Sequence, residues 1–195
     1  IEDSFVEEIR KMDGIKDFHI VDGVPIIFPY ISNGFSDMWI TNYIDRTPYL
    51  FSDDVIEDYK TNPSAYYGML IGIDEEQFDY VNQSLDNPID KQDFLNGESC
   101  IVQYEGSEIP KEYLNQRVFF NLQRKQYEIT VEAVSYDTQY SGRDIGASLI
   151  VSQDYLNSLI SKPTTLNMYI YYNQKYDEAL EKRITSLVDN SPYSN

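Results

Sequence analysis

The chain has 195 residues, of which 42% are apolar and 14% aromatic, and this content excludes a disordered chain because it is enough to build a hydrophobic core. Its 33 acidic and 15 basic side chains give a formal net charge of −18, which repels phosphate backbones and anionic lipid headgroups. Nucleic acid is therefore a poor candidate partner. A cationic ligand or peptide would be attracted, although an acidic surface without any partner has the same composition.

Histidine and cysteine, which carry much enzyme chemistry, occur once each, as His19 and Cys100. One cysteine cannot form an internal disulfide, and three or four ligands are needed for a zinc site. The glycines form neither a P-loop nor a dinucleotide-binding pattern. We therefore expect no enzyme activity, no metal site and no cofactor. A hydrolase that uses two carboxylates stays as a third possibility, because carboxylates are plentiful.

The beginning of the chain predicts a helix followed by a strand. Apolar residues recur on one helical face over residues 4–12, and Gly14 follows where a helix commonly ends. Residues 15–21, with the sequence IKDFHIV, have the composition of a strand. Gly23 and Pro25 are expected to end it.

The end of the chain predicts the same pair in reverse order. Residues 166–172 alternate in the manner of a half-buried strand, and residues 176–188 carry the apolar stripe of an amphipathic helix. Each terminal helix must cover a sheet or leave its stripe in water. We therefore expect the two terminal helices side by side on one face of a shared sheet, with Ile1 and Val188 emerging from the same end.

The middle of the chain is predicted to be rich in β-structure. Two short strands run directly into helices whose expected N-caps are Asp74 and Ser152. A hairpin is expected around the polar residues 123–126. The predicted strands are residues 68–73, 118–122, 127–134 and 148–151.

Stretches rich in proline, asparagine and glycine are expected to be connections and loops. They comprise residues 31–48, 84–93 and 135–146. Tyrosine and tryptophan in such loops can stack on sugars or pack against a protein partner, because loops on a rigid scaffold commonly display binding groups. The predicted ligand or partner surface is Trp39, Tyr43 and Tyr140; packing inside the core is the alternative for each of them.

Several segments, taken in order, form a recognisable pattern. They are EEIRKMDGIKDF (7–18), YGMLIGIDEEQFDYV (67–81), FLNGESCIV (94–102), LNQRVFF with QYEITVEAV (114–134), ASLIVSQDYLNSLI (147–160), and TTLNMYIYY with YDEALEKRITSLV (164–188). In this order they resemble the extracytoplasmic core domain of MacB-type, FtsX-like ABC transporter permeases. Asn115 and Gln116 stand where the family often has Gly-Gln, and residues 19–66 match none of the family's segments.

The resemblance implies an α+β fold of two lobes. Residues 1–50 and 145–195 would form a membrane-proximal α/β lobe from both chain ends, and residues 51–144 would form an inserted β-rich lobe. The domain would lie on the extracytoplasmic side of a bacterial membrane, anchored by flanking transmembrane helices outside this chain. It would do no chemistry, but would bind a substrate or partner and couple its own movement to a cytoplasmic ATPase.

The partners implied are that ATPase, a second copy of the permease and, from the net charge, a cationic peptide substrate. A different class of function also fits the sequence. A secreted or cell-wall adhesion module could bind carbohydrate or protein through its tyrosine and tryptophan loops. Hydrophobic helices encoded on both sides of the chain would favour the permease, whereas a signal peptide and a wall anchor would favour the adhesion module.

Overall fold

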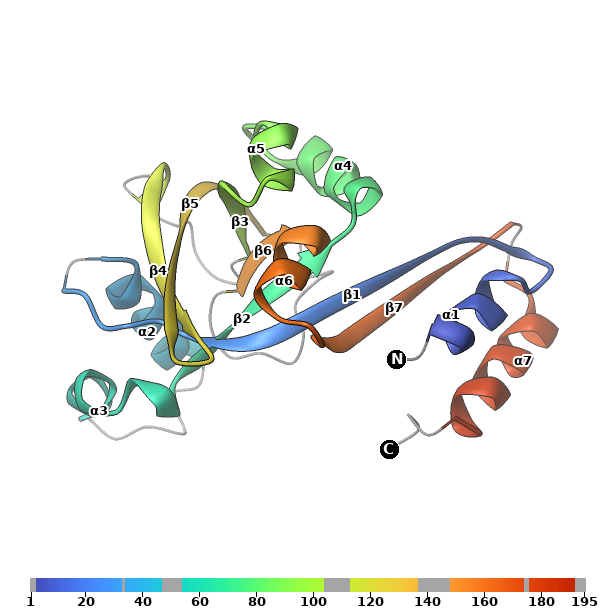
Figure 1. Ribbon diagram of the computed structural model, residues 1–195, viewed down its shortest axis with the longest axis horizontal. Helices are drawn as coiled ribbons and strands as arrows, with labels where there is room; N and C mark the ends of the chain where they lie inside the picture. The colour runs from blue at the N-terminus through green and yellow to red at the C-terminus, as the bar shows by residue number, and fades with distance from the viewer. Residues whose placement is uncertain are drawn as a thin grey trace. The chain divides into compact units, whose positions relative to one another are not determined.

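The computed structural model describes residues 3–32, 34–46, 54–103, 113–136, 148–173 and 176–191 (Figure 1). These residues form a mixed α and β structure with one seven-stranded sheet. The helices are α1 (Asp3–Arg10), α2 (Phe35–Arg46), α3 (Val55–Thr61), the short 3-10 helix η2 (Pro63–Ala65), α4 (Glu75–Ser84), α5 (Lys91–Leu95), α6 (Gln153–Leu159) and α7 (Glu178–Asp189). The strands are β1 (Ile15–Ile27), β2 (Tyr67–Ile73), β3 (Ser99–Gln103), β4 (Gln116–Leu122), β5 (Lys125–Ser135), β6 (Ser148–Ser152) and β7 (Thr164–Tyr172).

The chain divides into two compact units, one of which contains both chain ends. The terminal unit comprises Ile1–Ile20 and Asn167–Asn195, and the central unit comprises Val21–Leu166. The terminal unit is therefore smaller than the expected 1–50 with 145–195, and the central unit is larger than 51–144. Val24, Ile26 and Leu149, which the sequence placed in the membrane-proximal lobe, lie instead in the core of the central unit.

Strands of the central unit close into a ring. The strand order is β2-β6-β3-β5-β4-β1-β7, and an additional pairing joins β1 back to β2. Antiparallel pairs from Asp22 with Gly72 to Ile27 with Tyr67 make this closure. Every residue of β3 and β6 is buried, as is every residue of β2 after Tyr67, because these strands have neighbours on both edges and are covered on both faces.

The strand-to-helix junctions match the sequence predictions. The Asp74 Oδ1 atom accepts a hydrogen bond from the Gln77 backbone N–H at 2.8 Å, and the Gln77 side chain accepts one from the Asp74 N–H at 3.1 Å. This reciprocal pair is a capping box at the start of α4. Ser152 caps α6 in a simpler way, accepting a hydrogen bond from the Tyr155 N–H at 3.1 Å.

The expected hairpin is present, but its turn is tighter than the sequence indicated. Strands β4 and β5 pair as far as Leu122 and Lys125, which leaves only Gln123 and Arg124 in the loop. Both loop residues have positive φ, 50° and 66°, as a two-residue turn of the I′ type needs. Neither residue is glycine, asparagine or aspartate, so no residue of the usual type marks a two-residue turn at this position.

The prediction that Gly23 and Pro25 end the first strand is wrong, because β1 continues to Ile27. Gly23 is needed for close packing: a Cβ atom there would lie 2.5 Å from the Leu166 Cδ1 atom. Pro25 has no N–H to donate, yet its fixed φ is compatible with extended backbone, and it lies opposite Met69 in the pairing with β2. Two residues that usually interrupt strands are thus accommodated within β1.

In the terminal unit, both helices cover the same ribbon of two strands. Strands β1 and β7 are hydrogen-bonded neighbours. Val6 and Ile9 of α1 pack in one cluster with Phe18 of β1, and that cluster also contains Met168 of β7 and Leu187 of α7. Both helices therefore bury their apolar stripes on one face of the shared ribbon, as predicted. The common exit of the chain ends stays a prediction, because Ile1 lies outside the described residues.

None of the helices in the described part of the chain combines the length and the hydrophobicity that a membrane crossing requires.

Candidate functional site

The predicted aromatic surface is wrong for two of its three residues. Trp39 and Tyr43 lie on α2 with exposed fractions of 0% and 8%. Tyr140 lies outside the described residues. The segment 31–48, expected to be a connection, contains this helix because Phe35, Met38, Trp39 and Tyr43 recur at helical spacing and are all buried. Glycine and asparagine at 33–34 and proline at 48 flank the helix, and they obscured its period.

Trp39 lies at the centre of an aromatic cluster inside the central unit. Its ring centroid is 5.2 Å from that of Tyr59, 5.4 Å from that of Tyr43 and 5.5 Å from that of Phe28. Among the described residues, its Nε1 atom is buried without a hydrogen-bond partner. Such packing stabilises a core and leaves no face of the indole for a ligand.

Polar atoms at the edge of this aromatic cluster are paired. The buried Tyr59 hydroxyl donates a hydrogen bond to the Phe28 carbonyl oxygen at 2.6 Å. The Tyr66 hydroxyl donates to Asp58 Oδ2 at 2.6 Å. Burial, followed by this hydrogen bond and the Asp58 charge, raises the pKa of Tyr66 to about 12. Tyr59 and Tyr66 are therefore neutral and hydrogen-bonded, and Tyr59 ties α3 to the residue that follows β1.

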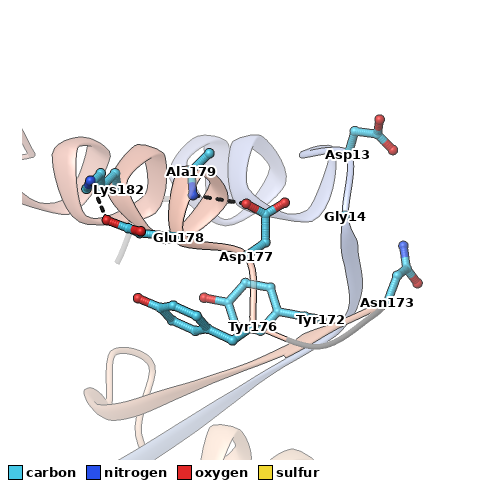
Figure 2. Close-up of a pocket in the computed structure, with 9 residues that line it drawn as sticks. All are labelled: Asp13, Gly14, Tyr172, Asn173, Tyr176, Asp177, Glu178, Ala179 and Lys182. Carbon is cyan, nitrogen blue, oxygen red and sulfur yellow. Dashed lines mark hydrogen bonds and ion pairs between the residues drawn. The ribbon is translucent and has the colours of Figure 1, made fainter.

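A better candidate for a binding site is an open cleft of about 790 Å³ in the terminal unit (Figure 2). It lies where the turn between α1 and β1 meets the segment that joins β7 to α7. The residues that line it are Asp13, Gly14, Tyr172, Asn173, Tyr176, Asp177, Glu178, Ala179 and Lys182.

Local backbone geometry builds the two walls of the cleft. Gly14 has φ +100°, which lets the chain reverse between α1 and β1. Its carbonyl oxygen accepts a hydrogen bond from the Asn173 N–H at 2.9 Å, which ties the end of β7 to the start of β1. On the opposite wall, Asp177 Oδ1 accepts hydrogen bonds from the N–H groups of Ala179 and Leu180 at 3.0 Å and caps α7.

The cleft carries an excess of negative charge. Its one basic side chain, Lys182, is paired with Glu178 at 2.6 Å. Within the part of the chain that the structure describes, Asp13 and Asp177 form no ion pair. In Figure 2 the Asp13 carboxylate lies above Gly14, on the opposite side of the cleft from Lys182. Two carboxylates are thus available to a cation.

Aromatic rings form the floor of the cleft. Figure 2 shows Tyr172 and Tyr176 below Asp177, and the Tyr176 side chain is 69% exposed. A hydrogen bond to Glu181 is the main cause that raises the pKa of Tyr176, with burial, the Glu181 charge and Tyr172 adding to it. The ring is therefore neutral at physiological pH, and its exposed face can attract a cation.

The chemistry that the cleft offers is recognition of positive charge. Carboxylates beside exposed tyrosine rings bind ammonium or guanidinium groups by charge and by cation–π attraction. Sequence reasoning missed the site because no motif marks it. A usable signal was present: Asp13 precedes the first predicted strand and Asp177 follows the last one, and neighbouring strands of opposite direction bring such positions together.

Of the comparisons with known proteins, only the one with solved structures gave a match. No family model matches the chain, and no curated protein matches it. Among solved structures, the chain is similar to the extracellular domain of the noncanonic ABC-type transporter YknZ from Gram-positive bacteria. The TM-score is 0.50 and the identity 13%, and the alignment covers 97% of this chain and 83% of the other. The periplasmic region of MacB from Actinobacillus actinomycetemcomitans gives a TM-score of 0.44 at 12% identity, covering 95% and 72% of the two chains.

At this level of identity the similarity to YknZ establishes the fold. The chain thus has the α+β fold of an ABC transporter extracellular domain, and the resemblance seen in the sequence is confirmed at the level of fold.

Proposed function

We propose that the chain is the non-catalytic extracytoplasmic domain of an ABC transporter permease. It binds a substrate or partner outside the membrane and transmits its movement to a cytoplasmic ATPase. The observation that carries the proposal is the match to the YknZ extracellular domain along nearly the whole of this chain. Such a domain needs rigid elements and a recognition surface rather than reactive groups.

The presence of both terminal segments in one compact unit supports the same proposal. A domain inserted between two transmembrane helices receives the chain from the membrane and returns it there. Both terminal segments belong here to one compact unit, and their helices share one hydrophobic cluster. Movement of that unit would therefore reach both flanking helices together.

The cleft of the terminal unit is the surface that we propose for a cationic segment of the substrate or partner. Its two carboxylates outside ion pairs and its exposed Tyr176 ring are complementary to lysine or arginine side chains. The net charge of −18 would attract the same ligands from a distance.

Expression of the natural gene tests the domain assignment. The full-length protein should fractionate with membranes and copurify with an ATPase subunit or contain an ATPase domain. Protease added from outside should cleave within this domain. Release of the protein as a soluble or wall-bound product without membrane helices would contradict the proposal and support the adhesion module.

Binding of a basic peptide tests the cleft. Octalysine, titrated calorimetrically at low and high salt, should bind more weakly as salt is added. Asp13→Asn and Tyr176→Ala should each reduce its affinity, because they remove a carboxylate and a cation–π surface. Asp154→Asn, an exposed carboxylate on α6, is the matched control. Equal losses for Asp13→Asn and Asp154→Asn would show only general attraction to an acidic protein.

A further inference from the structure

Strand β7 lies at the edge of the sheet but has an unusual composition for an edge strand. Within the described residues it stands last in the strand order, with β1 as its only neighbour. Its sequence, TTLNMYIYY, contains no charged residue and no proline. Edge strands of soluble proteins usually carry a charge, a proline or a bulge that prevents pairing with other chains. The outer edge of β7, the backbone edge that faces away from β1, has none of these.

The two faces of β7 differ in what they contact. Met168 and Ile170 belong to the hydrophobic cluster that the terminal helices cover. Side chains alternate between the two faces of a strand, so Tyr171 lies on the opposite face, where it is 45% exposed. Its ring lies edge-on to that of His19, with centroids 5.7 Å apart, and the His19 Nε2 atom is 2.9 Å from Asp17 Oδ2. This second face combines an aromatic ring with a carboxylate, which favours a cation.

The candidate cleft begins where β7 ends. Tyr172, the last residue of the strand, and Asn173 line the cleft together with Asp13 and Asp177. Figure 2 shows Tyr172 and Asn173 at the entrance to the segment that leads to Asp177. Residues 167–172 and the residues that line the cleft all belong to the terminal unit. A peptide that runs along the outer edge therefore ends beside the carboxylates of the cleft.

We propose that the outer edge of β7, over residues 167–172, binds a basic peptide segment as an added strand, with one lysine or arginine side chain in the cleft. The inference rests on the proposed function, because it specifies how a cationic segment of the substrate or partner is held. Main-chain hydrogen bonds give such strand addition its affinity, and side-chain contacts give its specificity. The net charge of −18 favours a basic strand and repels an acidic one. This length of strand spans about 20 Å, which an octapeptide covers.

Calorimetry with two octapeptides tests for strand addition. The first peptide alternates lysine and valine, and the second is the same peptide with a methyl group on every peptide-bond nitrogen. The second peptide keeps the charges and side chains but has no peptide N–H to donate. We expect it to bind at least about tenfold more weakly, because several main-chain hydrogen bonds are lost. The amide I band of the first peptide, labelled with ¹³C at its carbonyl groups, should move to the β-sheet position only in the complex.

The outcomes separate strand addition from the cleft itself. Equal affinities for the two peptides, with Asp13→Asn weakening both, would overturn strand addition and leave the cleft as the cation site. Absence of binding by either peptide would overturn both proposals. Membrane fractionation of the full-length protein tests the domain assignment independently of these results.

A disulfide cross-link tests where the peptide lies. Tyr171→Cys should trap a lysine–valine peptide that carries one central cysteine, because cross-strand neighbours come within disulfide distance. Tyr80→Cys is the control, since Tyr80 is exposed but belongs to α4 in the central unit. The native Cys100 is fully buried and does not interfere. Equal trapping at the two positions, or cross-linked protein dimers in place of the peptide adduct, would overturn the proposal.

Discussion

Replacement of Trp39 by alanine should destabilise the protein strongly, in contrast to the small effect expected for a surface aromatic residue. The side chain is fully buried and contacts three other rings. A buried tryptophan removes roughly 150–250 Å² from water, which at about 25 cal/mol per Å² corresponds to about 4–6 kcal/mol. Alanine retains a little of this, and core substitutions of this type cost about 3–5 kcal/mol.

The environment of the indole nitrogen reduces the stability that Trp39→Ala is expected to lose. The Trp39 Nε1 atom is buried without a partner among the described residues, so removing it recovers part of a desolvation penalty of about 1–3 kcal/mol. We therefore expect a loss near 3 kcal/mol for Trp39→Ala. Trp39→Phe, which keeps a ring and removes the N–H, should lose much less.

Urea unfolding followed by circular dichroism measures these differences, since Trp39 is the only tryptophan and its fluorescence disappears in the variants. Tyr80→Ala is the control, because Tyr80 on α4 is 60% exposed and its loss should change stability by no more than about 0.5 kcal/mol. A loss below about 1 kcal/mol for Trp39→Ala would refute the reasoning. So would wild-type fluorescence that is quenched by iodide as readily as free tryptophan.

Three further substitutions test other parts of the fold, each read from urea unfolding. Asp74→Ala should cost about 1 kcal/mol because it removes the cap of α4 and leaves Gln77 without its reciprocal partner; an unchanged midpoint would contradict the capping geometry. Gly97→Ala should lower the free energy of unfolding by more than about 2 kcal/mol. Gly97 has φ +74°, and a Cβ atom there would lie 2.1 Å from Tyr155 Cδ2. An unchanged stability would contradict that close contact. Burial, with smaller contributions from nearby acidic groups, raises the pKa of Glu132, so its ionisation opposes folding as pH rises through that raised value. Glu132→Gln should therefore be more stable than wild type at pH 7, where Glu132 is charged, but not below about pH 4, where it is protonated. A variant that is less stable than wild type at pH 7 would refute this.

Local signals in the sequence were sufficient where periodicity and capping residues agree. Asp74 and Ser152 cap helices directly after buried strands, as their positions predicted. The terminal helices lie on one ribbon because each carries a stripe that a neighbouring strand must cover. Predictions were wrong where residues that usually break structure occur within it. Gly23 and Pro25 lie inside β1, and glycine and proline near α2 obscured its helical spacing.

The candidate site was harder to predict because it depends on tertiary structure. The composition of residues 31–48 predicts a loop, and hence a surface position for Trp39 and Tyr43, whereas their place on a buried helical face puts them in the core. The cleft combines Asp13 and Asp177, which are far apart in the chain. Only the pairing of β1 with β7 brings them together, and that pairing has no sequence motif of its own.

The central claim, that this domain transmits binding outside the membrane to an ATPase inside it, is tested most directly by ATP hydrolysis in reconstituted transporter. Full-length protein with its ATPase, in lipid nanodiscs, should change its hydrolysis rate when a basic peptide such as octalysine is added on the extracytoplasmic side. Asp13→Asn combined with Tyr176→Ala should remove that response and leave basal hydrolysis and assembly unchanged, while Asp154→Asn should preserve it. An equal response from the cleft variant and the wild type, or from the ATPase alone, would contradict the account.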